Sequence, residues 1–263
     1  MLVASSTTQE RNTARNTEKV QGPFFCPECQ AEVVLKKGPK RAHHFSHKPP
    51  VNCIYGSGES ELHYKAKYEI YGALTGHPNC SNCELESRLD GVRPDICLYI
   101  NGKYVAIEVQ KSTITIDDIV RRTIRYTELG MYLLWVVPHS EPKTHYRKNE
   151  RVYAYRIKEW EKYLHAMYYG RIYLWQEQAF VVPYHFDEFK IWKEESQWYD
   201  EYGDEQYGGG YFRRAKSLRL PKSYSKRQHI AEDFVAKRRD SFVISGRDIP
   251  SCNLWKDNLR NWW

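Results

Sequence analysis

The chain has 263 residues, of which 40 are lysine or arginine and 33 are aspartate or glutamate, giving a formal net charge of +7 and a pI of about 8.9. This length permits one large domain or a core with attached regions, and we expect a core with attachments. The charge favours a polyanionic partner, whereas the lack of any apolar run near the ~20 residues that a bilayer requires excludes a transmembrane helix.

The first twenty residues, MLVASSTTQERNTARNTEKV, begin with a short apolar run and continue with polar residues. They lack the basic start and apolar middle of a secretion signal, which predicts a cytoplasmic, reducing location. The chain has seven cysteines, an odd number, and two pairs have C-x-x-C spacing. Metal binding is therefore favoured over a disulfide framework.

The first organised segment, FFCPECQAEVVLKKGPKRAHHFSHKPP, has the spacing of a zinc site. Two residues separate Cys26 from Cys29, fourteen follow, and His44 and His47 repeat the two-residue gap. Two thiolates and two imidazoles joined by a hairpin would satisfy tetrahedral zinc. We predict a structural zinc ion on these four residues, with His43 able to replace His44. The alternative is buried thiols beside surface histidines.

A second group in HPNCSNC consists of His77, Cys80 and Cys83, and its only evident fourth ligand is Cys53. The proline and asparagine residues are typical of turns. We therefore expect a loop here rather than a second metal site.

Residues 59–74 have the period of an amphipathic helix. The apolar stripe consists of Leu62, Ala66, Ile70 and Leu74. A polar stripe with the same spacing runs beside it: Glu59, His63 and Lys67. Such a stripe is either a solvated face with ordinary ion pairs or part of a site, and its position in the fold decides between them.

The stretch VRPDICLYINGKYVAIEVQKS, residues 92–112, holds two strand-like runs joined by an Asn-Gly dipeptide. That dipeptide favours a two-residue type I′ turn, which pairs Ile100 with Lys103, so that the numbers of paired residues sum to 203. Asp95 then lies opposite Glu108 in a non-hydrogen-bonded pair, where side chains are closest.

Alternation along these strands predicts one apolar face and one face that carries the acids. The apolar set is Ile96, Leu98, Ile100, Val105, Ile107 and Val109, and the other set is Asp95, Cys97, Ala106, Glu108 and Gln110. Two carboxylates ~5 Å apart at an effective dielectric of ~20 repel by about 3 kcal/mol, so removing either acid should not lower stability. A divalent cation such as Mg²⁺ would cancel the repulsion. The alternative is neutralisation by an arginine such as Arg93.

Residues 115–130, TIDDIVRRTIRYTELG, predict a helix that Thr115 caps and Gly130 ends. The apolar MYLLWVVP follows as a buried strand. This order predicts a right-handed crossover, with the strand around Leu133 parallel to that of Glu108. Three arginines of the helix are either solvated or phosphate contacts: Arg121, Arg122 and Arg125.

Beyond Pro138 the chain is rich in tyrosine and tryptophan, with one helical segment, IKEWEKYLHAMYYG, and two strands in RIYLWQEQAFVVPYHF. Residues 187–205 hold eight acids and two lysines, GGG follows at 208–210, and residues 213–227 carry seven basic residues and no acid. The basic run suits phosphate contacts or a disordered, solvated tail.

The order of a helix with Glu59, a strand, RPDI, AIEVQ, a helix and a strand resembles the PD-(D/E)XK, or restriction-endonuclease-like, nuclease superfamily. The motifs CPEC, HFSH, ES, RPDI, IEVQKS, RT and LLW in this order resemble the competence protein CoiA family over about residues 20–138. The resemblance implies an α+β fold, with a restriction-endonuclease-like core of a mixed sheet flanked by helices. We expect an N-terminal zinc-binding region at 1–55, the nuclease core at 56–140 and an aromatic, basic C-terminal region at 141–263.

The resemblance also implies that Asp95 and Glu108 bind Mg²⁺ or Mn²⁺, that Glu59 assists, and that Gln110 occupies the position of the superfamily's lysine. A neutral amide can orient water or phosphate but supplies no positive charge to the transition state. The residues expected to contact nucleic acid are His63, Lys67, Lys111, Arg121, Arg122, Arg125, Arg213, Arg214, Lys216 and Arg219.

Two functions follow as hypotheses. The first is a metal-dependent nuclease that hydrolyses DNA phosphodiester bonds, linked to DNA uptake, recombination or defence against foreign DNA. The second is a non-catalytic DNA-binding module on the same fold. The neutral Gln110 favours binding, whereas three acids beside phosphate favour cleavage. DNA, and not a membrane, is the expected partner.

Overall fold

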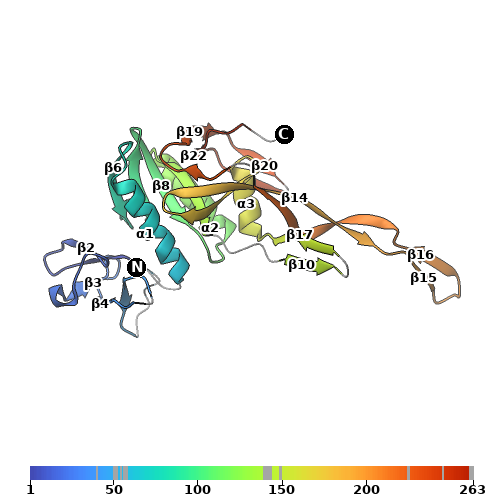
Figure 1. The fold of residues 1–263 in the computed structure, drawn as a ribbon, viewed down its shortest axis with the longest axis horizontal. Helices are drawn as coiled ribbons and strands as arrows, with labels where there is room; N and C mark the ends of the chain where they lie inside the picture. The colour runs from blue at the N-terminus through green and yellow to red at the C-terminus, as the bar shows by residue number, and fades with distance from the viewer. Residues whose placement is uncertain are drawn as a thin grey trace.

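The computed structural model of the protein describes residues 1–39, 41–49, 53, 55, 59–138, 144–147, 150–223, 226–244 and 246–260. A small N-terminal sheet and a large mixed sheet each enclose a hydrophobic core. A third, small apolar cluster lies at the base of a long β-ribbon that projects from the large sheet (Figure 1).

The N-terminal sheet has five short antiparallel strands in the order β2-β1-β3-β4-β5. Their bounds are β1 (Val3–Ser5), β2 (Arg11–Thr13), β3 (Phe24–Phe25), β4 (Glu32–Lys36) and β5 (His44–His47), with a 3-10 turn, η1 (Lys19–Gln21), before β3. Because side chains alternate across a strand, Val33 and Leu35 of β4 both point inward, and they pack with Phe24 and Phe45.

The large sheet runs β12-β17-β14-β13-β9-β8-β7-β6 and has eleven strands within the described residues. The strands on this path are β6 (Cys80–Leu85), β7 (Ile96–Ile100), β8 (Lys103–Val109), β9 (Tyr132–Pro138), β12 (Tyr155–Arg156), β13 (Ile172–Glu177), β14 (Phe180–Lys193) and β17 (Tyr211–Ser223). Three more are attached: β18 (Gln228–His229) to β14, β22 (Cys252–Asp257) to β9, and β19 (Phe234–Arg239) to β22. Separate hairpins are β10 (Thr144–Arg147) with β11 (Glu150–Tyr153), β15 (Ser196–Tyr199) with β16 (Glu205–Gly208), and β20 (Phe242–Ile244) with β21 (Arg247–Ile249).

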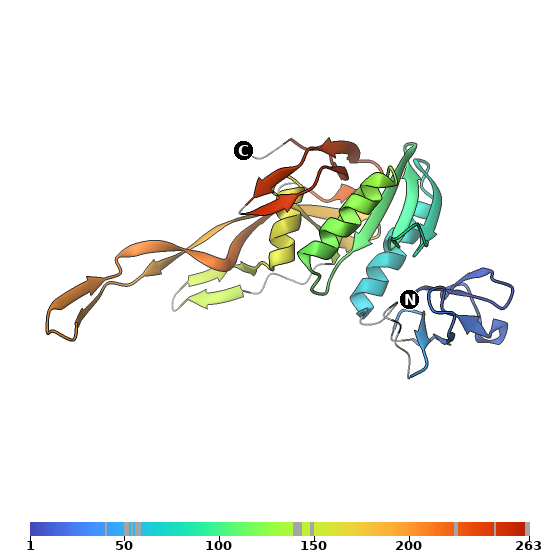
Figure 2. The ribbon, with the colours of Figure 1, turned by 180° about the vertical axis from the view of Figure 1, so that it is seen from behind.

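Helices cover both faces of this sheet. Helix α1 (Glu61–Thr75) packs on one face, while α2 (Ile116–Glu128) and α3 (Glu159–Met167) contact each other on the opposite face (Figures 1 and 2). The α+β expectation is therefore confirmed, while the specific restriction-endonuclease fold stays a prediction. No helix within the described residues is both long and apolar enough to cross a bilayer.

The predicted hairpin register is confirmed. Strands β7 and β8 pair from Ile96 with Ile107 to Ile100 with Lys103. Both turn residues have positive φ, 49° at Asn101 and 72° at Gly102, as a type I′ turn requires. The predicted crossover is also confirmed, because β8 and β9 are parallel and α2 connects them.

The prediction of one polar face on this hairpin is wrong. Cys97 is 2% exposed and Ala106 is fully buried. The reason is that the sheet has helices on both sides, with α2 bonded to Glu108 through Arg122 and Tyr126. The short side chains of Cys97 and Ala106 do not face solvent but belong to the main hydrophobic core.

The basic run at 213–227 is mostly a strand and not a tail. Residues up to Ser223 form β17, which pairs along β14. Three basic residues of the run have acidic partners: Arg214 with Glu188, Lys222 with Asp187, and Arg227 with Glu177. The acidic and basic blocks of the sequence thus compensate each other in part across one antiparallel ribbon.

The outer part of this ribbon, residues 189–216, projects from the body and is called the arm below (Figures 1 and 2). Its base is anchored by a cluster of Ala154, Phe189 and Ala215. At Gly209, φ is +92° and an added Cβ would lie 1.9 Å from the Glu194 carbonyl oxygen. Glycine at this position therefore lets the two sides of the ribbon approach each other closely.

The large sheet contains strands from both sides of the boundary that was expected at residue 140. Strand β13 lies parallel to β9, and β14 and β17 extend the sheet further. The proposed division into a core and a C-terminal region remains a prediction about domains.

Candidate functional site

A cavity of 490 Å³ lies where the start of α1 meets the start of β7 and the end of β8. Among its lining residues are Glu59, His63, Lys67, Glu86, Asp95, Glu108, Gln110 and Arg122. Ser60 caps α1 by accepting the His63 amide, which sets Glu59 at the helix entrance. The polar stripe predicted on this helix therefore belongs to the cavity and not to a solvated face.

Lys67 is the centre of the cavity's charge network. Its side chain is 1% exposed, and its Nζ lies 2.5 Å from Glu59 Oε1 and 2.6 Å from Glu86 Oε1. Asp95 Oδ1 is 3.0 Å away. Burial disfavours the ammonium, but the surrounding carboxylates outweigh it and raise the pKa of Lys67 well above its usual value. Lys67 was expected to contact nucleic acid; its buried ammonium instead holds the three acids together, and contact with nucleic acid stays a prediction.

Asp95 sits at the edge of the sheet, one residue before β7. Its Oδ2 accepts a hydrogen bond from the Val109 amide at 2.8 Å and lies 3.4 Å from His63 Nε2. Burial alone would raise its pKa, but Lys67 and then His63 bring the pKa of Asp95 far below its usual value. This carboxyl is therefore ionised at neutral pH.

Glu59, His63 and Asp95 have ligand atoms within 4.8 Å of one another and could hold a metal ion. Burial opposes ionisation of Glu59, yet Lys67, the Met1 ammonium and His63 lower its pKa to about 2. Glu59 Oε2 lies 3.2 Å from the Met1 nitrogen but has no hydrogen-bond partner within the described chain. A buried carboxylate oxygen without such a partner suits a cation ligand.

Glu108 lines the same cavity but is bound from the side of α2. It is 2% exposed, accepts a hydrogen bond from Tyr126, and pairs with Arg122 at 2.9 Å. Burial, with a further contribution from Asp95, raises the pKa of Glu108 to about 7 although Arg122 opposes the shift. Asp95 and Glu108 thus belong to one cavity with very different proton affinities.

The expected repulsion between these two acids is largely compensated, because each has its own cation. Lys67 compensates Asp95, and Arg122 compensates Glu108. Arg93, the arginine considered from the sequence, instead pairs with Glu28 and lies over the Tyr55 ring at 3.9 Å. Glu108 is thus neutralised by an arginine, but by Arg122 of α2 and not by Arg93, which lies in the loop before β7.

The other predicted site residues divide by location. Gln110 lines the cavity, and its amide donates to the Ser112 carbonyl at 2.8 Å. Lys111, next to it, is half-buried and is not among the residues that line this cavity. On the outer side of α2, Arg121 pairs with Asp118, while Arg125 pairs with Asp90 and Glu128. On the arm, Arg213, Arg214 and Lys216 are exposed. Arg219 lies on β17 beyond the arm and donates to the Ala215 and Leu218 carbonyls.

Sequence reasoning missed Glu86, which follows β6 and is 4% exposed. It accepts hydrogen bonds from the Leu2 amide at 2.8 Å and the Tyr55 hydroxyl at 2.5 Å, besides Lys67. In the sequence, only its position as an acid at the end of a predicted strand pointed to Glu86, and this signal is weak. Tyr126 belongs to the sequence pattern that resembles the CoiA family, but its hydrogen bond to Glu108 from within α2 was not predicted.

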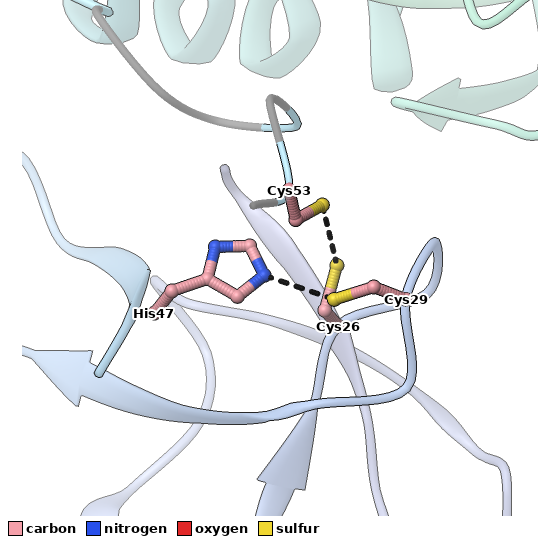
Figure 3. A group of neighbouring side chains, drawn as sticks. All are labelled: Cys26, Cys29, His47 and Cys53. Carbon is pink, nitrogen blue, oxygen red and sulfur yellow. Dashed lines mark hydrogen bonds between the residues drawn. The ribbon is translucent and has the colours of Figure 1, made fainter. Parts of the chain in front are cut away.

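Four side chains converge in the N-terminal region: Cys26, Cys29, His47 and Cys53 (Figure 3). Cys26 Sγ lies 4.0 Å from Cys53 Sγ, and Cys29 Sγ lies 3.4 Å from His47 Nε2. Tetrahedral bonds of ~2.3 Å to sulfur and ~2.0 Å to nitrogen place ligand atoms roughly 3.5 to 3.8 Å apart. The cluster could therefore hold a zinc ion. The Glu28 amide also points at Cys26 Sγ, at 3.4 Å.

The predicted ligand set is corrected at one position, since Cys53 takes the place expected for His44. Residues three apart on a strand face opposite sides, and both histidines lie on β5, so only one can reach the cysteines. His44 instead stacks on Tyr64 at 5.2 Å, and His43 is not in the cluster.

Among the described residues, Cys80 and Cys83 belong to no group of possible metal ligands. Cys80 and Cys83 lie on β6 and not in the expected loop, while His77 is grouped with His229 and Glu232. The Nδ1 atoms of both histidines accept backbone N–H groups. Neutral rings then carry their protons on Nε2, which leaves no lone pair for a metal ion.

Two family models match the chain: "Competence protein CoiA, nuclease-like domain" over residues 59–191, and "Competence protein CoiA, N-terminal domain" over residues 6–56. The chain is also 31% identical over 121 residues to the competence protein CoiA of Bacillus subtilis (strain 168). That match covers 46% of this chain and 32% of the relative, so it spans about a third of the relative's length. No solved structure matches. The first model covers the acidic cavity, and the second covers the cysteine cluster.

Proposed function

The chain belongs to the competence protein CoiA family, and we propose that its acidic cavity hydrolyses DNA phosphodiester bonds with the aid of a divalent metal ion. The observation that carries the proposal is the convergence of Glu59, His63 and Asp95 in a cavity that Glu108 also lines. The nuclease-like domain of the family supports the reaction class, and the biological setting would be the handling of incoming DNA.

The charges of the cavity suit a cation. Three carboxylates, those of Glu59, Glu86 and Asp95, surround Lys67. Even with the Met1 ammonium beside Glu59, the acids outnumber the ammonium groups. Arg88, Arg93 and Arg122 also line the cavity, but phosphate placed next to the three carboxylates would be repelled unless a bound cation compensated their charge. Oxygen ligands of this kind suit Mg²⁺ or Mn²⁺.

In this proposal, Asp95 and Glu108 would hold the ion, and Glu59 would do so directly or through water. The bound ion would supply Lewis acidity and a more acidic water molecule. The chain's own residues do the rest: Lys67 fixes the orientation of Asp95, and Arg122 and Tyr126 fix that of Glu108. Gln110, with its amide held by Ser112, would orient water or phosphate at the cavity wall.

The test is a cleavage assay on single- and double-stranded DNA with Mg²⁺, with Mn²⁺ and without either. We expect cleavage that requires one of the two ions. The alternative is a DNA-binding module that does not cut, favoured by the neutral Gln110 at a position where the superfamily has lysine. Tight DNA binding without cleavage in any of these conditions would reject the nuclease and support the module.

The affinity for Mg²⁺ should depend on pH through Glu108. This carboxyl must be ionised to bind a cation, and burial raises its pKa to about 7. We expect the association constant to rise about tenfold per pH unit below pH 7 and to level off above it. Calorimetric titration of the metal-free protein measures this. Glu108→Gln should bind more weakly and without the pH dependence, and a flat profile in the unaltered protein would remove Glu108 from the ligands.

The same shift affects stability. The pKa of Glu108 in the folded protein lies above its usual 4.5. Its contribution to the free energy of unfolding is therefore fully present below pH 4.5 and is lost as the pH rises through about 7.

We also propose that the cluster of Cys26, Cys29, His47 and Cys53 binds a structural zinc ion, supported by its donor set and spacing. We expect about one equivalent of zinc per chain by elemental analysis. Cys53→Ser should lose most of it and melt at a lower temperature. His44→Ala is the matched control, because His44 lies beside the cluster and should leave the zinc content unchanged. The reverse pattern, with zinc lost only in His44→Ala, would restore the ligand set expected from the sequence.

A further inference from the structure

The arm carries its charges in two separate blocks. Its tip, residues 194–208, has six acidic residues and no lysine or arginine. Its stem, residues 189–193 and 211–216, has five basic residues and no acid: Lys190, Lys193, Arg213, Arg214 and Lys216. Large aromatic side chains are exposed along both blocks. The stem and the tip therefore both expose aromatic side chains, but the stem is basic and the tip is acidic.

One face of the stem combines aromatic and basic side chains. The strand register pairs Lys190 with Arg214 and Trp192 with Phe212. Because side chains alternate, these four share a face, and all four are exposed. The opposite face is anchored through Phe189. The rings of Trp192 and Phe212 meet edge to face at 4.9 Å, and Phe212 is 64% exposed.

The spacing on this face suits a nucleotide. Two residues along a strand span about 7 Å, so the basic pair lies one step from the aromatic pair. Arg214 has a partner in Glu188, but the stem as a whole has five cations and no acid of its own. Cations attract a phosphate backbone, and unpaired bases stack on exposed rings whatever their sequence.

We infer that the stem binds single-stranded DNA, with unpaired bases stacked on Trp192 and Phe212 and phosphates held by Lys190 and its basic neighbours. The acidic tip repels phosphate and so confines the strand to the stem. The choice of DNA rests on the proposed function, but binding at the stem needs no cleavage in the cavity. The stem would hold one strand of the DNA substrate away from the acidic residues of the cavity.

The experiment measures binding of the full-length protein to fluorescein-labelled oligothymidylate by anisotropy, without divalent metal. Phe212→Ala should raise Kd roughly tenfold, because one stacking surface is lost. Tyr207→Ala is the matched control: this ring is 70% exposed on the same arm, but it lies on the acidic tip, and its loss should leave Kd unchanged. Lys190→Ala should reduce the slope of log K against log salt by about one.

Both aromatic variants must keep the melting temperature of the unaltered protein, which their exposure predicts. Equal effects of Phe212→Ala and Tyr207→Ala, or none from either, would overturn the inference. So would a Phe212→Ala variant that binds DNA normally but changes the molar mass measured by light scattering, since the stem would then be a protein interface. A protein that cuts no DNA but needs Phe212 to bind it would reject the nuclease alone. Cleavage with binding that does not depend on Phe212 would reject the stem alone.

Discussion

Asp95→Asn should reduce DNA cleavage by roughly a thousandfold, which corresponds to about 4 kcal/mol of lost transition-state stabilisation. Asparagine keeps the shape of the side chain and can still accept the Val109 amide. It loses the negative charge that would hold the divalent ion and that pairs with Lys67. Single-turnover cleavage with saturating Mg²⁺ measures the chemical step separately from DNA binding.

Asp90→Asn is the control for this variant, because Asp90 is 84% exposed and pairs with Arg125 on the outer side of α2. Its cleavage rate should stay within twofold of the unaltered protein, given the small energy of exposed ion pairs. Undiminished cleavage by Asp95→Asn would show that the catalytic ion lies elsewhere.

Asp95→Asn should also lower the free energy of unfolding, by about 1 to 3 kcal/mol, because Lys67 loses one of its buried partners. Bare repulsion between the acids would predict an increase instead. The folded-state pKa of Asp95 lies below its usual 3.8, so its contribution is present above that pH and is lost as the pH falls through the folded-state value. The variant should therefore lose less stability than the unaltered protein on acidification.

Lys67→Met should destabilise the protein most, by about 3 to 5 kcal/mol, because it leaves buried carboxylates without their shared cation. Methionine fills a similar volume, so packing loss contributes little. Thermal unfolding measured at about pH 7 and about pH 5 tests the cause: protonation of the unpaired acids at the lower pH should restore part of the loss.

Lys65→Met is the matched control, since Lys65 lies on the same helix, is 61% exposed and is 3.7 Å from Glu69. Its effect should stay within about 0.5 kcal/mol. If Lys67→Met unfolded like the unaltered protein but bound DNA more weakly, Lys67 would contact DNA, as its place on a polar stripe first indicated.

The sequence predicted those features that local chemistry determines. The Asn-Gly turn fixed the register that brings Asp95 toward Glu108, and the strand–helix–strand order predicted the parallel pair of β8 and β9. Spacing alone also predicted that Cys26, Cys29 and His47 lie in one cluster. Each of these depends on residues close in the chain or on one standard connection.

The failures share one cause, which is that partners came from elsewhere in the fold. Cys53 joins the cluster across a distance that no spacing rule covers, while His44 is excluded by the alternation of β5. Glu86 and Arg122 complete the charge balance of the cavity from β6 and α2. The basic run at 213–227 gave no sign that it pairs with the acidic segment of β14, so the arm was not predicted.

Glu86 connects the two metal-binding regions proposed here. Its carboxylate accepts hydrogen bonds from the Leu2 and Val3 amides in the N-terminal region. It also accepts hydrogen bonds from the hydroxyl of Tyr55, two residues after Cys53, and from Lys67. Glu28, between the first two cysteines, pairs with Arg93 beside the cavity. Removing zinc from the cysteine cluster would therefore loosen contacts that orient Lys67. A chelator that takes only this zinc would then abolish activity at the cavity, even with the divalent ion of the cavity still bound. Inhibition by a chelator would not identify the catalytic metal in this protein, whereas recovery by Mg²⁺ alone, with the zinc content measured, would.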